Sequence, residues 1–88
     1  MDKNNSIHNL SLNNRKDMSM DGVKEVVSFD ENKIILQTTQ GNLYIKGDDL
    51  NIQKLNLENS NIKISGHITL LEYTDKIDKK GILNRLFK

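Results

Sequence analysis

The sequence contains no cysteine, no proline, no tryptophan and no alanine among its 88 residues. The lack of cysteine excludes disulfides and thiolate metal sites, and it is consistent with a reducing compartment. The longest unbroken aliphatic run is Ile34–Leu36, which is far below the roughly 20 residues that span a bilayer as a helix. The N-terminus lacks a basic start and an apolar stretch, so we expect no signal peptide. These absences predict a cytoplasmic protein.

Positive charge is scarce in most of the chain and is concentrated at its end. Residues 1–75 carry eight Lys and Arg against eleven Asp and Glu, whereas residues 76–88 carry five Lys and Arg against one Asp. A net charge of +1 is too balanced for a general nucleic-acid-binding protein. The sequence predicts a single domain in three parts: a disordered N-terminus at 1–6, a mildly acidic body at 7–75, and a basic tail at 76–88.

The body of the chain shows an alternation of apolar and polar residues with a period of two. This pattern is typical of strands that bury one face. The clearest example is the hairpin at 34–45, which is predicted to turn at Gln40-Gly41. Ile35 and Tyr44 fall on the opposite face of this hairpin. We therefore expect that second face to be covered or to contact another molecule.

The stretch at 50–73 repeats the alternation with interruptions. The spacing changes at Gln53-Lys54, which predicts a kink, and at Asn59-Ser60, which predicts a turn. On a helical wheel the same apolar residues scatter, so the pattern favours strands. The core is expected to contain Phe29, Leu43, Ile45, Leu50, Ile52, Leu57, Ile62, Ile64 and Ile68.

These patterns predict a small all-β domain of short, mostly antiparallel strands, arranged as a rolled sheet or a small sandwich. A solenoid-like stack of short strands is the alternative, although the apolar units recur at irregular spacings. Val27 and Phe29 are expected on one face of a strand with Val26 on the other. Residues 47–49 are expected to end the hairpin, because Gly and Asp favour turns.

The tail at 76–88 differs from the strands because its apolar residues follow helical spacing. A helix this short is marginal in water and becomes ordered only against a surface. That surface is a groove on a partner protein, an anionic membrane, or the sheet of the same chain. The candidate partner-binding residues are Ile82, Leu83, Arg85, Leu86 and Phe87 in the amphipathic tail, and Tyr44 on the second hairpin face.

Residues that could carry a reaction are few and are not grouped. His8 and His67 are the only histidines, and neither belongs to a metal-binding or catalytic motif. Asp48-Asp49 lacks the ligand spacing of a calcium loop and is typical of a turn. We therefore expect no enzyme, no metal and no cofactor. A small nucleic-acid-binding β-barrel is the alternative function, but it requires a basic, aromatic strand face.

A series of short motifs from about Leu10 to Tyr73 resembles the YabP/YqfC family of sporulation proteins. The motifs are Asn14-Arg15, Gly22-Val23, Val27-Ser28-Phe29-Asp30, Thr38 with Gly41, Ile45 with Gly47, Leu50-Asn51-Ile52, Leu55-Asn56-Leu57-Glu58, and Ile64 to Gly66 followed by Ile68. The ending at 81–87 is similar to the C-terminus of YabP-type members. One departure is at 59–61, where relatives often carry a glycine and this chain has Asn-Ser-Asn.

This resemblance implies a non-enzymatic protein of endospore-forming bacteria. Such a protein is made in the mother cell and acts in building the cortex and coat of the spore envelope. The expected partners are proteins, either a sporulation membrane protein or a second copy of the chain associated through strand edges. A peripheral contact of the tail with the outer forespore membrane is the membrane alternative. The family supplies no catalytic residue to carry over.

Overall fold

The computed structural model describes residues 7–74, which form one six-stranded sheet and contain no helix. The strands are β1 (Leu10–Asn13), β2 (Asp17–Met20), β3 (Val23–Asp30), β4 (Lys33–Thr38), β5 (Gly41–Asn56) and β6 (Asn61–Thr74). Their order across the sheet is β1-β2-β6-β5-β4-β3, and every pair of neighbours is antiparallel. The predicted all-β fold is confirmed, and antiparallel pairing throughout excludes the solenoid-like stack.

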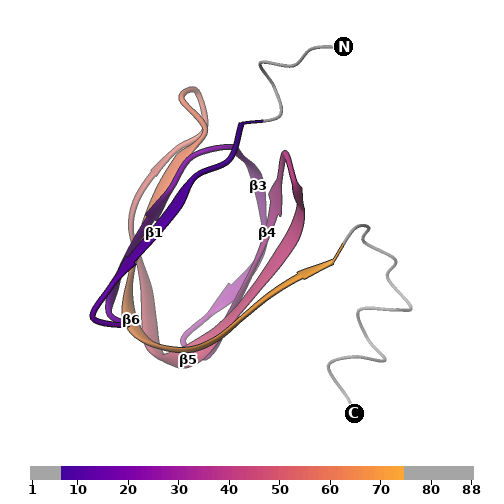
Figure 1. The fold of residues 1–88 in the computed structure, drawn as a ribbon. Coiled ribbons are helices and arrows are strands. Elements are labelled where there is room, and N and C mark those ends of the chain that lie inside the picture. Colours follow the sequence, from indigo (N-terminus) through magenta and orange to yellow (C-terminus); the bar gives the residue numbers. More distant parts are fainter. Residues whose placement is uncertain (1–6, 75–88) are drawn as a thin grey trace.

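The shape of the sheet comes from β5 and β6, which are long and bend near their middles. The pairing between them shifts register after Lys46 and again after Asp48. Such bulges bend a strand and increase its twist. The bends at 47–50 and 66–68 lie opposite each other, and we call them together the corner. The sheet turns back on itself there, so that it forms a roll (Figure 1).

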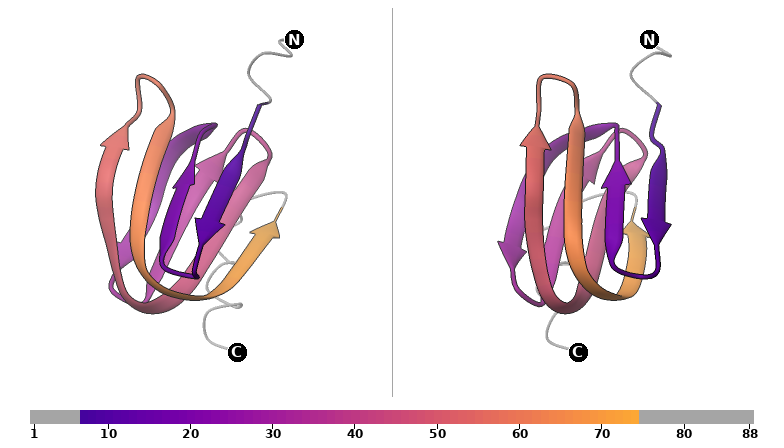
Figure 2. Two further views of the ribbon diagram at one scale, coloured as in Figure 1. Left: turned by 60° about the vertical axis from the view of Figure 1, so that its left-hand side comes forward. Right: turned by 90° about the vertical axis from the view of Figure 1, so that its left-hand side faces the viewer.

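The roll has two layers that face each other across the core (Figure 2). Layer A contains β1, β2, the start of β6 at 61–65 and the end of β5 at 50–56. Layer B contains β3, β4, the start of β5 at 41–48 and the end of β6 at 67–74. The rolled sheet is therefore the correct one of the two predicted arrangements, although its two halves pack like a small sandwich.

The core lies between the layers and draws on both of them. Its members are Met18, Met20, Leu50, Ile62 and Ile64 from layer A, and Val23, Ile34, Leu36, Leu43, Ile45 and Ile68 from layer B. Most of the predicted core residues are confirmed, and Ile52 is partly buried against this cluster. Leu57 is 47% exposed, so its predicted core position is wrong. It lies in the turn after β5 and not on the strand itself.

Two predictions about strand length are wrong, because the chain bends where a break was expected. Residues 47–49 do not end the hairpin, and β5 continues through them to its full 16 residues. Asp49 adopts a left-handed φ of 56°, and pairing with β6 resumes between Asn51 and Ser65. The strand β6 has 14 residues. The expectation of short strands therefore holds for β1 and β2 but fails for β5 and β6.

A bulge in β3 also changes which residues share a face. The register of β3 on β4 shifts after Val26, where Val27 is the extra residue. Val26 and Phe29 consequently pair with Leu36 and Ile34, two residues that face the core. The prediction that Val26 and Phe29 lie on opposite faces is wrong for this reason. Phe29 is also 48% exposed because β3 is the edge strand, so its predicted core position is wrong.

The predicted turns and the kink are confirmed. The hairpin between β4 and β5 turns at Thr39-Gln40, between the paired residues Thr38 and Gly41, which is one position before the predicted Gln40-Gly41. The register of β5 on β6 shifts between Ile52 and Lys54, where the kink was expected. The turn between β5 and β6 places Ser60 at a φ of 60°. Between residues 7 and 74 no helix is long and apolar enough to cross a bilayer.

Candidate interaction surface

One side of the roll is closed by His8, which lies just before β1. Its Nδ1 is 2.7 Å from the carbonyl oxygen of Asp21, and its Nε2 is 2.7 Å from the Tyr73 hydroxyl. Because a carbonyl can only accept, Nδ1 donates to Asp21, and Nε2 shares the second hydrogen bond with the Tyr73 hydroxyl. The two rings meet edge to face with centroids 5.7 Å apart. The start of layer A is thereby held against the end of β6 in layer B.

Asp21 and Tyr73, the two partners of His8, both have pKa values shifted from the ordinary ones. The Asp21 carboxylate accepts hydrogen bonds from the backbone N–H of Asn9 at 2.6 Å and from the Asn9 side-chain amide at 3.2 Å. These bonds, and to a smaller degree the nearby His8, hold the pKa of Asp21 below its ordinary value of 3.8. Desolvation raises the pKa of Tyr73, so its hydroxyl stays protonated beside His8.

The opposite side of the roll is joined at its two ends. At one end, the N–H of Leu50 donates to the carbonyl of Glu31, just after β3, at 2.8 Å. At the other end, the N–H of Val23 donates to the carbonyl of Ser60 at 3.0 Å. Between these anchors, β3 and the second half of β5 each have one strand neighbour within the described sheet. Two strand edges therefore lie along the same side of the molecule.

These edges carry four large apolar side chains that are exposed to solvent. Val27 and Phe29 on β3 are 39% and 48% exposed, and Leu55 near the end of β5 and Leu57 in the turn after it are 43% and 47% exposed. We call these four residues the apolar rim. Single exposed apolar residues are ordinary, but several of them along one side indicate an interaction site. The β3 bulges twist that edge away from simple sheet extension, so side chains are expected to dominate contacts there.

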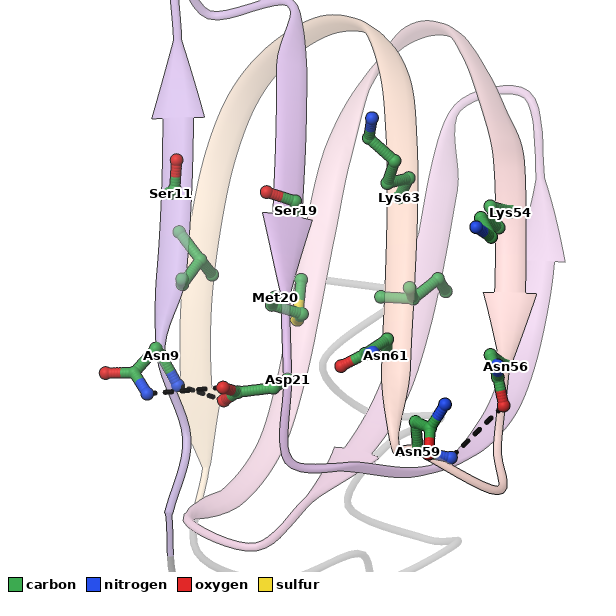
Figure 3. Close-up of a pocket in the computed structure, with 12 residues that line it drawn as sticks. Asn9, Ser11, Ser19, Met20, Asp21, Lys54, Asn56, Asn59, Asn61 and Lys63 are labelled. Carbon is green, nitrogen blue, oxygen red and sulfur yellow. Dashed lines mark hydrogen bonds between the residues drawn. The ribbon is translucent and has the colours of Figure 1, made fainter.

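The outer face of layer A contrasts with the apolar rim because it is polar. Ser11, Ser19, Lys63 and Lys54 are cross-strand partners in one row across four strands. A shallow hollow lies on this face, and Figure 3 shows this row along it. The carboxylate that lines the same hollow, Asp21, accepts hydrogen bonds from Asn9 and does not pair with either serine of the row. The arrangement is therefore that of a solvated sheet face.

Within the described residues, the titratable side chains do not assemble a reaction centre. Both ring nitrogens of His8 are engaged by Asp21 and Tyr73. His67 is exposed at the corner. No group of three or more His, Cys, Asp or Glu side chains in the described part of the chain is placed to hold a metal ion.

The predicted partner-binding residues fall in two places. Tyr44 pairs with Ile35 and points away from the core, as predicted, but it is only 3% exposed. Its contact with a partner stays a prediction. The tail residues lie outside the described residues, and they are Ile82, Leu83, Arg85, Leu86 and Phe87.

The apolar rim was not found from the sequence. Phe29 and Leu57 were assigned to the core because each continues an apolar alternation. Phe29 lies close to the turn at 31–32, and Leu57 is the first residue of the turn at 57–60. An apolar residue beside a turn, at the end of an edge strand, has few neighbours to bury it. This position beside a turn is the sequence feature that indicates exposure of Phe29 and Leu57.

Comparison with known proteins gives a match over most of the chain. The sequence profile of the YabP family matches residues 4–80. The chain belongs to the YabP family. One relative is the spore protein YabP of Bacillus subtilis (strain 168), which is 36% identical over 84 residues. This alignment covers 92% of the chain and 84% of the relative. The resemblance drawn from the short motifs is thereby confirmed.

Two glycines of the YabP-type motifs lie at the corner, where the strands come very close. A Cβ on Gly47 would lie 2.0 Å from the backbone oxygen of His67. A Cβ on Gly66 would lie 2.6 Å from the backbone oxygen of Asp49, and Gly66 has a φ of 129°. Both positions therefore require glycine for β5 and β6 to turn together.

The YabP-type pair Asn14-Arg15 also serves the corner. Both residues have a positive φ, 55° and 56°, which is the geometry of a tight hairpin turn. The turn presses against β6, where the N–H of Ile68 donates to the carbonyl of Arg15 at 2.9 Å. The Arg15 Nε donates in return to the carbonyl of Ile68 at 3.1 Å. The β1–β2 turn thus fixes the bend of β6.

Proposed function

We propose that this protein acts in sporulation as a non-enzymatic component of spore-envelope assembly, made in the mother cell. The proposal is supported by membership of the YabP family and by the relative in Bacillus subtilis that is named a spore protein. It is also supported by the form of the described residues, which present surfaces on a rolled sheet and no grouping of reactive side chains. The cortex and the coat are the envelope layers concerned.

The protein acts by association with other proteins through the apolar rim. The observation that supports this mechanism is the exposure of Val27, Phe29, Leu55 and Leu57 along one side of the roll. Fully burying a large apolar side chain contributes roughly 1.5–3 kcal/mol, and because these four are already about half buried, the rim supplies roughly 3–6 kcal/mol. The entropy lost on association offsets much of this gain. Reversible binding follows, which strengthens when several copies assemble.

The partner is a second copy of the chain or a sporulation membrane protein that presents an apolar segment. The place of action is the cytoplasm of the mother cell, at the surface of the outer forespore membrane. A domain of this kind brings envelope components together by binding them. The polar outer face of layer A, with the row from Ser11 to Lys54, stays in water during this contact.

The test replaces two rim residues in the spore-forming bacterium that encodes the chain. The Val27→Ser, Phe29→Ser variant is expected to lose its position at the forespore, followed with a fluorescent fusion, and to give spores with a thin or absent cortex in electron micrographs. Leu70→Ser is the matched control, because Leu70 is 39% exposed but lies on β6. Normal spores from the rim variant, or the same defect in the control, would refute the proposal.

A further inference from the structure

The outer face of layer B is buried although it points away from the core. Ile35 and Tyr44 are cross-strand partners on β4 and β5. Their chain neighbours Ile34 and Ile45 belong to the core, so alternation places Ile35 and Tyr44 on the other face. Ile35 is nevertheless 2% exposed and Tyr44 is 3% exposed. A sheet face with such low exposure is covered by something.

A polar group on the same face leads to the same conclusion. Asn42 lies two residues before Tyr44 on β5 and is 3% exposed. Its side-chain oxygen accepts no hydrogen bond from residues 7–74. A buried amide oxygen without a donor costs free energy, so native structures provide a partner for it. That donor is expected from outside the described strands.

The described strands do not supply the cover. All six of them belong to the one rolled sheet, and their mutual packing is on the inside of the roll. The cover therefore comes from the residues before 7 or after 74. Residues 1–6 are Met-Asp-Lys-Asn-Asn-Ser, which offer little apolar surface. Residues 75–88 include Ile82, Leu83, Leu86 and Phe87, whose spacing puts them on one side of a helix.

The point where the described chain ends also favours the tail. β6 ends at Thr74, which pairs with Asn42 on this same face. Fourteen residues in a helix extend for roughly 20 Å, whereas four strands at their usual spacing are roughly 14 Å across. The segment at 75–88 is therefore long enough to cross the whole of layer B from its starting point.

We propose that residues 75–88 dock on the outer face of layer B of their own chain, with the apolar side of the tail on Ile35 and Tyr44. The two predicted partner-binding sites, Tyr44 and the tail, then satisfy each other. The apolar rim is left as the surface for other proteins. This inference does not depend on the proposed role in sporulation.

The test uses paramagnetic broadening in the full-length chain. The sequence has no cysteine, so Lys88→Cys gives a single site for a nitroxide spin label at the end of the tail. Docking predicts loss of the amide signals of Ile35 and Tyr44 in the ¹⁵N-labelled protein, with recovery when the nitroxide is reduced. The signals of Ser19 and Lys63, on the outer face of layer A, are the control and are expected to keep their intensity.

A mixed sample separates docking within one chain from docking between two. It contains ¹⁵N-labelled chains without nitroxide and spin-labelled chains without ¹⁵N. The intramolecular contact predicts no broadening in this sample. Broadening of Ile35 and Tyr44 in the mixture would identify a second copy as the occupant and overturn the inference. Unchanged signals of Ile35 and Tyr44 in the first sample would also overturn it, since the tail would then be elsewhere, on a membrane or a partner protein.

A pair of tail variants tests the apolar contact itself. Phe87→Ser in the spin-labelled chain is expected to restore the Ile35 and Tyr44 signals. Asn84→Ser changes a neighbouring residue of the tail outside the apolar set and is expected to leave the broadening intact. Equal effects of the two variants would contradict the proposed contact. The spectrum of the core residues, including Leu43, verifies that the sheet is folded in each variant.

Discussion

The corner of the roll gives the sharpest test of the fold, through the substitution Gly47→Ala. An alanine Cβ at this position would lie 2.0 Å from the backbone oxygen of His67, where ordinary contact begins at 3.4 Å. The oxygen belongs to the paired strand, so no side-chain rotation relieves the contact. The two strands must separate at the point where they bend together. Gly47 also donates to the carbonyl of Asn32 at 3.1 Å, and this bond is lost when the strand moves.

The expected cost follows from these two contacts. Forcing an extra methyl group into a packed site costs about 1–3 kcal/mol, and one lost backbone hydrogen bond costs about 1 kcal/mol. The free energy of unfolding is therefore expected to fall by about 2–4 kcal/mol, out of roughly 4–13 kcal/mol for a chain of this length. The corresponding decrease in Tm is roughly 10–30 °C. Urea and thermal unfolding, followed by far-ultraviolet circular dichroism, measure both quantities.

Whether Gly47→Ala lowers or raises the free energy of unfolding shows whether the two strands approach closely at Gly47 or leave room for a methyl group. Where an alanine fits without strain, replacing glycine stabilises a protein by roughly 0.4–1 kcal/mol through the unfolded chain. Gly47→Ala would do the same if the corner had room for a methyl group. Asp48→Ala is the matched control, since Asp48 is the exposed neighbour in the same bend, and its effect is expected within about 0.5 kcal/mol of zero. A neutral or stabilising Gly47→Ala would refute the corner geometry.

Three further outcomes are expected. Arg15→Ala removes the donor to the carbonyl of Ile68 and is expected to lower the free energy of unfolding by about 1–2 kcal/mol in urea titrations. Ile64→Ala in the core is expected to cost about 2–5 kcal/mol, and Ile64→Val about 1 kcal/mol, in the same assay. The lowered pKa of Asp21, due to the hydrogen bonds from Asn9, adds stability above the ordinary value of 3.8 that disappears as pH falls through the lowered value. Unfolding at stepped pH measures this loss.

Each of these outcomes has a matched comparison. Lys16→Ala, next to Arg15 on the same turn, is expected to have little effect, and an equal loss from both would deny the bond to β6. Lys63→Ala changes the exposed neighbour of Ile64 and should leave stability nearly unchanged. Asp21→Asn is expected to flatten the acid limb of the stability curve. An unchanged acid limb in that variant would show that the Asp21 carboxylate does not contribute to the closure.

The sequence was sufficient to predict the kind of fold, because the period of two survives in the stretches between the bulges of the roll. The hairpin at 34–45 appears as expected, with Ile35 and Tyr44 on its second face. The kink near Gln53 is present as a register shift. These features depend on local spacing and turn chemistry, which a single sequence displays directly. They predict that neighbouring strands pair antiparallel, but they do not predict the bend of β5 and β6 at the corner.

The sequence predicts a strand end at 47–49 where β5 in fact bends, because the bend depends on residues that are distant in the chain. Gly47 and Asp48-Asp49 form a turn-like string, and nothing within that string shows that β6 bends alongside it. The bend requires a second glycine, Gly66, nineteen positions away in the chain. The β1–β2 turn at Arg15 then holds the bend by hydrogen bonds. Contacts between distant segments of this kind leave no periodic signal in the sequence.

The apolar rim was missed for a related reason. Alternation predicts which side chains share one face of a strand. It does not predict whether another strand lies beside them to bury them. Phe29 faces the core side of β3, but β3 is the edge strand, and the side chain is therefore 48% exposed. Strand order across the sheet decides this exposure. The order follows from the long β5–β6 pairing, of which the sequence predicts only shorter pieces.

We propose that this protein works by contact through the apolar rim. The most direct test of this contact places a photo-crosslinking phenylalanine analogue at position 29 in sporulating cells, with the same analogue at position 63 on the polar face as the control. Phe29 is 48% exposed and Lys63 is also exposed, so both sites are accessible. We expect a defined crosslinked protein at position 29, either a second copy or an envelope component, and none at position 63. Identical products at both positions, or none at position 29, would contradict it.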